Sequence, residues 1–103
     1  MRAGSYFGLV AVVGDLDREE EEHLVARIQA VARRAGHTQP ERRIVSIQRL
    51  SPGLEVRTTS EKLAHRIARE LQKAFGGEAT YRWSEHEGAL RAVWTAPQRV
   101  AAR

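Results

Sequence analysis

The order of strand and helix signals predicts an α+β domain in which a β-sheet carries two helices on one face. Three observations lead to this expectation. Residues 6–13 are strand formers, two amphipathic helical patterns begin near residues 15 and 58, and strand-like segments lie between and after them. A chain of 103 residues has room for one such domain with a single core. The expected order is therefore β-α-β-β-α-β-β.

The first strand and the first helix follow directly from this pattern. Tyr6 to Val13 is apolar at both odd and even positions, which suits a central strand with a neighbour on each side. A helix of about 20 residues should follow, with Asp15 or Asp17 as N-cap and Gly36 as its end. The acidic run 19–22 is placed where the helix dipole favours anions. The expected core stripe is Leu24, Val25, Ile28, Val31 and Ala32.

Two strands are expected next, at 42–50 and 54–58, separated by a Ser-Pro-Gly turn. Alternate residues of the later strand share one face; these are Leu54, Val56 and Thr58. The earlier strand is irregular, because its apolar residues do not keep a two-residue period. They are Ile44, Val45 and Ile47. A β-bulge would explain this irregularity.

The second helix is predicted from Thr58 to Phe75. Thr58 and Glu61 have the spacing of a capping box, and Gly76 and Gly77 favour a left-handed stop. One side is apolar, comprising Leu63, Ala64, Ile67, Ala68, Leu71, Ala74 and Phe75. On the opposite side four cations lie within roughly 60° of one another at about 100° per residue. They are Lys62, Arg66, Arg69 and Lys73.

A hairpin is expected at the end of the domain, with strands at 78–84 and 89–95. The fifth strand should extend the sheet past the fourth, which would leave the second and fifth strands as edges. The domain would then span 1–96, with a flexible tail at 97–103. The first six elements match a ferredoxin-like β-α-β-β-α-β fold. We therefore expect that fold with an extra C-terminal strand, an antiparallel-rich sheet and both helices on one face.

The hairpin also carries three of the six aromatic residues of the chain, Tyr81, Trp83 and Trp94. The simplest packing turns all three toward the helices as part of the core. The alternative is a platform on the open sheet face, where bases could stack. If the three are core, the open face of the hairpin is basic and polar and suits phosphate. It would consist of Thr80, Arg82, Ser84, Arg91 and Val93.

Several function classes have little support in the sequence. The chain has no cysteine, so disulfides, thiol catalysis and cysteine zinc sites are excluded, and a reducing cytoplasm is the expected location. No Gly-rich phosphate loop is present, and the four histidines fall on different elements. We expect no enzyme activity, no metal and no cofactor. The longest apolar run, 9–13, is far shorter than a membrane span, so no membrane partner is expected.

The positive charge of the chain leads us to expect an anionic partner. The formal net charge is +4, and residues 41–103 hold twelve Lys and Arg against seven acidic residues. The predicted function is RNA binding through the basic helix face, with further contacts from the sheet. The residues predicted to bind are Lys62, Arg66, Arg69, Lys73, Arg57, Arg82 and Arg91. The alternative is a protein-interaction module or homodimer that pairs through the edge strand at 42–50.

Five segments from Pro40 onward follow one pattern in order, and they are 41–44, 53–60, 63–68, 74–77 and 90–94. In these segments the sequence resembles a family of small uncharacterised bacterial proteins. The family is distantly similar to the eukaryotic adaptor that exports the large ribosomal subunit from the nucleus, which implies association with RNA or the ribosome. Its members carry an upstream cysteine-rich zinc segment that this sequence lacks. The resemblance gives motif positions, without roles, to Thr58, Thr59, His65, Arg66 and Trp94.

Overall fold

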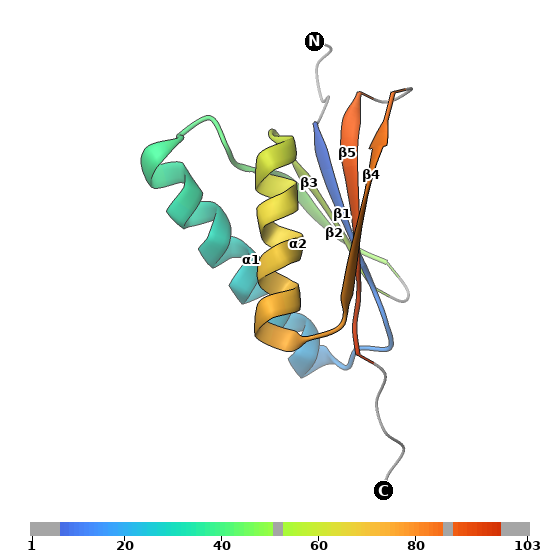
Figure 1. Ribbon diagram of the computed structural model, residues 1–103. Coiled ribbons are helices and arrows are strands. Elements are labelled where there is room, and N and C mark those ends of the chain that lie inside the picture. The colour runs from blue at the N-terminus through green and yellow to red at the C-terminus, as the bar shows by residue number, and fades with distance from the viewer. Residues whose placement is uncertain (1–6, 51–52, 86–87, 98–103) are drawn as a thin grey trace, which may run out of the picture.

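The computed structural model describes residues 7–50, 53–85 and 88–97, and it has the predicted α+β architecture (Figure 1). Its elements are β1 (Gly8–Val13), α1 (Arg18–Thr38), β2 (Ile44–Arg49), β3 (Leu54–Thr58), α2 (Glu61–Phe75), β4 (Glu78–Ser84) and β5 (Ala89–Thr95). Both helices lie on one face of a five-stranded sheet and leave the other face open. Parts of the two predicted turns, and the predicted tail from residue 98, lie outside the described residues.

The sheet has the strand order β2-β3-β1-β5-β4. β1 is central, as predicted, and runs antiparallel to β3 and parallel to β5. The expectation that the fifth strand lies outside the fourth is wrong, because β5 lies between β1 and β4. β5 is the more apolar of the two hairpin strands, so the inner position, which α2 covers, removes more apolar surface from water. The edges of the sheet are therefore β2 and β4.

The core lies between the helices and the covered face of the sheet. Its helical part contains most of the two predicted stripes, with Leu24, Ile28, Val31, Ala35, Leu63, Ala64, Ile67, Ala68 and Leu71 buried. The sheet contributes Val10, Val12, Leu54, Val56, Ala92 and Trp94. Thr58 is also fully buried, and its hydroxyl donates to the Ser60 carbonyl oxygen at 2.6 Å. No helix within the described residues is long and apolar enough to cross a membrane.

The register of β2 against β3 shifts between Ile44 and Ser46, which is the irregularity that the apolar pattern predicted. The shift resolves the conflict among the three apolar residues. Ile44 and Ile47 pack against the core, whereas Val45 is 45% exposed. The bulge therefore turns one aliphatic side chain of this edge strand toward solvent.

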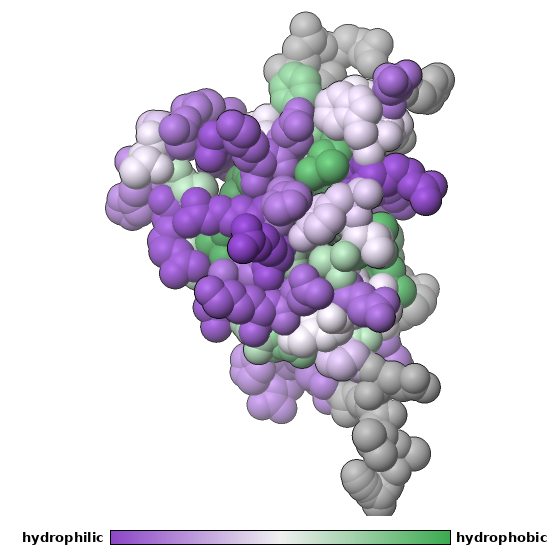
Figure 2. All heavy atoms as spheres, viewed as in Figure 1, coloured by the Kyte–Doolittle hydropathy of each residue, from purple (hydrophilic) through white to green (hydrophobic). Residues whose placement is uncertain are grey.

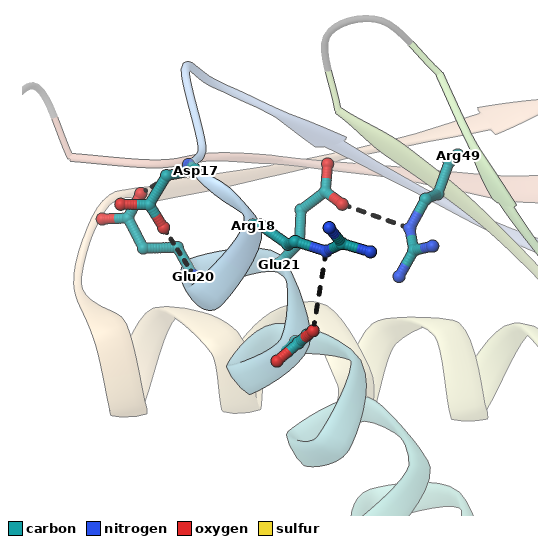
Figure 3. A network of polar contacts seen from close by, with 6 residues as sticks. Asp17, Arg18, Glu20, Glu21 and Arg49 are labelled. Atoms are coloured by element: carbon teal, nitrogen blue, oxygen red, sulfur yellow. Dashed lines mark hydrogen bonds and ion pairs between the residues drawn. The ribbon is translucent and has the colours of Figure 1, made fainter.

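The N-terminus of α1 uses its acidic run for local structure (Figure 3). Asp17 is the N-cap and forms a capping box with Glu20, in which each side chain accepts from the other residue's backbone N–H at 2.8–2.9 Å. Glu21 pairs with Arg49 of β2 at 3.1 Å. The predicted end at Gly36 is wrong: the helix continues to Thr38 with Gln39 as C-cap, because Gly36 does not adopt the left-handed conformation of a stop.

The N-cap of α2 is Ser60, and the predicted capping box of Thr58 and Glu61 is wrong. The Ser60 hydroxyl accepts from the backbone N–H groups of Lys62 and Leu63. Thr58 cannot take this role, since it continues β3 and its side chain is buried. Thr59 instead holds the chain before β2: its hydroxyl donates to the Glu41 carbonyl oxygen and accepts from the Arg43 N–H.

The C-terminus of α2 is held against β5 through two glycines. Gly76 and Gly77 both have positive φ, as the predicted stop requires. The indole N–H of Trp94 donates to the Gly76 carbonyl oxygen at 2.8 Å, which satisfies one of the helix's last carbonyl groups. A Cβ on Gly77 would overlap the Thr95 carbonyl oxygen. Only glycine therefore allows the helix end to approach β5 this closely.

Candidate nucleic-acid interface

The predicted basic stripe, which we define as Lys62, Arg66, Arg69 and Lys73, lies along the solvent side of α2. All four residues are exposed. Glu70 interrupts the charge pattern on the α1 side, but it pairs with Arg27 of α1 at 3.2 Å. Among the described residues, none of the four cations forms an ion pair. The stripe therefore presents four uncompensated positive charges over about 16 Å of helix.

The three sheet arginines of the predicted site lie on the opposite side of the molecule from the stripe. The side chains of β3 and β1 that enter the core alternate with Arg57 and Leu9, so these residues face away from the helices. Leu9 pairs with Arg57 on one side and with Arg91 on the other, and Arg91 pairs with Arg82. The three arginines thus form one row across the open face.

The charges in this row are not equally available. The guanidinium of Arg57 is 3.0 Å from a carboxylate oxygen of Glu55 and 3.4 Å from the amide oxygen of Gln48. Arg82 and Arg91 face each other on neighbouring strands and form no ion pair within the described part of the chain. Like charges placed directly opposite destabilise a sheet, so this pair would gain from a bound anion. The structure consequently divides the predicted site into two separate surfaces.

The aromatic residues of the hairpin do not share one environment. Trp94 is 1% exposed and packs edge-on against Phe75, so the core prediction is confirmed for it. The same prediction is wrong for Tyr81 and Trp83, which are 37% and 49% exposed. They do point to the helix side, since they pair with Ala92 and Leu90 of β5. They stay exposed because β4 is the edge strand and none of the described elements lies beyond it to cover them.

Tyr81 connects this edge to the basic stripe. Its ring stacks on His65 of α2 with the ring centroids 4.3 Å apart and the planes 24° from parallel. Partial burial raises the pKa of the Tyr81 hydroxyl above its ordinary value of 10.0, and the nearby positive charge of Arg69 acts in the opposite direction. Figure 2, which views this side, shows hydrophilic side chains gathered over α1 and α2 and paler ones over the β4 edge. The stripe and the exposed aromatic rings are therefore neighbours.

The chain matches no protein-family model, no curated protein and no solved structure. The resemblance noted from the sequence thus stays a prediction. The structure accounts for much of its motif without a ligand, because Thr58 and Trp94 form hydrogen bonds at the two ends of α2 and Thr59 holds the chain before β2. His65 and Arg66 are the exposed members. The described residues contain no group of His, Asp and Glu side chains placed to hold a metal ion.

Proposed function

We propose that this protein is a non-enzymatic RNA-binding domain whose main contact is the basic stripe of α2. The observation that carries the proposal is the row of four exposed cations without ion-pair partners among the described residues. A chain of phosphates suits such a row, because each Lys or Arg that neutralises a phosphate releases a counterion condensed on the RNA, and this release is entropically favourable. Association with the ribosome rests on the sequence resemblance and stays a prediction.

The open-face arginines form a second and smaller basic surface in this proposal. Arg82 lies on the open face of β4, next in sequence to Tyr81 on the helix face. An RNA strand bound to α2 would have to pass over the β4 edge to reach Arg82 and Arg91. We therefore expect these two residues to contribute only to the binding of longer RNA.

The test compares two double variants that remove the same charge. Arg66→Ala with Arg69→Ala removes two stripe cations, and Arg33→Ala with Arg34→Ala removes two exposed cations of α1. Binding of a labelled single-stranded RNA is measured by fluorescence anisotropy in about 0.1 M salt. Each lost phosphate contact lowers the binding constant by about 0.7 log units for each tenfold decrease in salt concentration below 1 M. The stripe variant loses two contacts, so at about 0.1 M salt it should bind roughly 25-fold more weakly. The α1 variant should lose less than about threefold, because distant charges are screened. Equal losses would contradict a site on α2.

A second candidate function is self-association through β2. Val45 and Leu50 are each 45% exposed at this edge, and a hollow of 510 Å³ beside it has Ile44 and Ile47 in its wall. However, bulges are one means by which proteins block edge pairing, and β2 is bulged. For this reason we favour RNA binding over self-association through β2.

Sedimentation across a concentration series decides between the two candidates. We expect a monomer at high micromolar concentration, unchanged by Val45→Lys. A dimer that Val45→Lys dissociates would favour the edge-pairing function, because the introduced charges would meet near the two-fold axis. Ile47 is the poorer test position, since it packs against the core.

A further inference from the structure

Two aromatic side chains stand exposed on the β4 edge, where no described element of the chain covers them. We call Tyr81 and Trp83 the aromatic ledge. They project from the same face of one strand, so their Cα atoms are about 7 Å apart. Trp83 is 49% exposed, whereas the other tryptophan, Trp94, is buried and hydrogen-bonded. The exposed indole offers a partner a large, flat apolar surface with a polar N–H, the kind of side chain that is enriched at interfaces.

The surroundings of the ledge define the chemistry of that partner. His65 covers one face of the Tyr81 ring, and the charge of Arg69 is close enough to act on the Tyr81 hydroxyl. The ledge therefore lies alongside the basic stripe, next to its middle part. A partner that fits both must carry negative charges along its length and flat π-surfaces beside them.

We propose that the ligand of this surface is single-stranded RNA, with a base stacked on Trp83 and its phosphates on the stripe. This inference rests on the proposed function and specifies its ligand. Single-stranded RNA offers both required groups, whereas a duplex keeps its bases stacked on one another and unavailable. Stacking is tolerant of sequence because every base has a π-face, so little sequence preference is expected.

Tryptophan fluorescence tests the inference directly, since the chain has two tryptophans and only Trp83 is exposed. The probes are a ten-nucleotide oligouridylate, a chain of equal length and charge without bases, and a duplex of the same length. The oligouridylate should quench Trp83 and bind most tightly. Trp83→Ala should weaken its binding about 5- to 150-fold, the range for loss of one stacked base. Trp83→Phe, which keeps an aromatic ring, should restore most of this affinity.

Val45→Ala is the matched control, because Val45 is exposed to a similar degree on the opposite edge. Its affinity should equal that of the unchanged protein. The inference is overturned if the base-free chain or the duplex binds as tightly as the oligouridylate and leaves Trp83 unquenched. In that case weakening by Arg66→Ala with Arg69→Ala would still support the proposed function. If the oligouridylate still quenches Trp83 and binds the double variant with unchanged affinity, the proposed role of the basic stripe is overturned and that of the aromatic ledge is supported. Absence of RNA binding would overturn both.

Discussion

The two strands of the C-terminal hairpin carry tryptophans that point to the same side of the sheet and yet have opposite environments. Trp94 on β5 is buried beneath the end of α2, whereas Trp83 on β4 is half exposed beside its N-terminal half. The difference comes from strand order, because β5 is inside the sheet and β4 is its edge. Burial on this face is thus decided by which strand is covered. The covered tryptophan stabilises the fold, and we propose that the uncovered one stacks on an RNA base.

The largest effect on stability should come from Trp94→Ala. It removes a fully buried aromatic side chain and the hydrogen bond to the Gly76 carbonyl oxygen. We expect a loss of about 3–5 kcal/mol in the free energy of unfolding, measured by urea denaturation. A loss under about 1 kcal/mol would mean that Trp94 is exposed and that the contrast between the two strands is wrong.

A smaller effect should follow from Gly77→Ala. The substitution places a Cβ against the Thr95 carbonyl oxygen at a residue with positive φ, so it should cost about 1–3 kcal/mol. Gly36→Ala is the control of opposite sign. Gly36 lies inside α1 with open space around it, and alanine there should stabilise by about 0.5–1 kcal/mol. Thermal unfolding of both variants tests the pair. A stable Gly77→Ala protein would show that α2 does not end against β5.

The smallest effect should come from Trp83→Ala, which should change the free energy of unfolding by less than about 1 kcal/mol because the side chain is half exposed. The same denaturation experiment measures it. A loss approaching that of Trp94→Ala would place Trp83 in the core and remove the aromatic ledge.

Much of the fold could be predicted from local patterns. The bounds of β3, β4 and β5 and the Asp17 cap agree with the sequence signals, since hydrophobic period and turn residues encode them locally. Strand order could not be predicted in this way. Tyr81, Trp83 and Trp94 all lie at strand positions whose side chains point toward the helices. Only the strand order β1-β5-β4 makes Trp94 buried and the other two exposed. The Ser60 cap could not be predicted locally, because Thr58 has the better capping-box spacing to Glu61. Thr58 is excluded from that role only because it belongs to β3, where it pairs with residues of β1 and β2 that are distant in sequence.

The candidate site was predicted in part for the same reason. The four stripe cations follow a local helical spacing, which correctly predicts that they share one exposed side of α2. That Arg57, Arg82 and Arg91 lie on the other side of the sheet depends on how distant strands pair. The contact between His65 and Tyr81 joins a helix to an edge strand, so no short sequence pattern could indicate it.

The salt dependence of RNA binding tests the central claim, that the α2 stripe contacts the RNA backbone, most directly. Four single-strand phosphate contacts predict a slope of about −3 for the logarithm of the binding constant against the logarithm of salt concentration, at about −0.7 per contact. Arg66→Ala with Arg69→Ala should flatten this slope by about 1.4. A slope that is the same in the double variant and the unchanged protein would contradict the account and remove α2 from the interface.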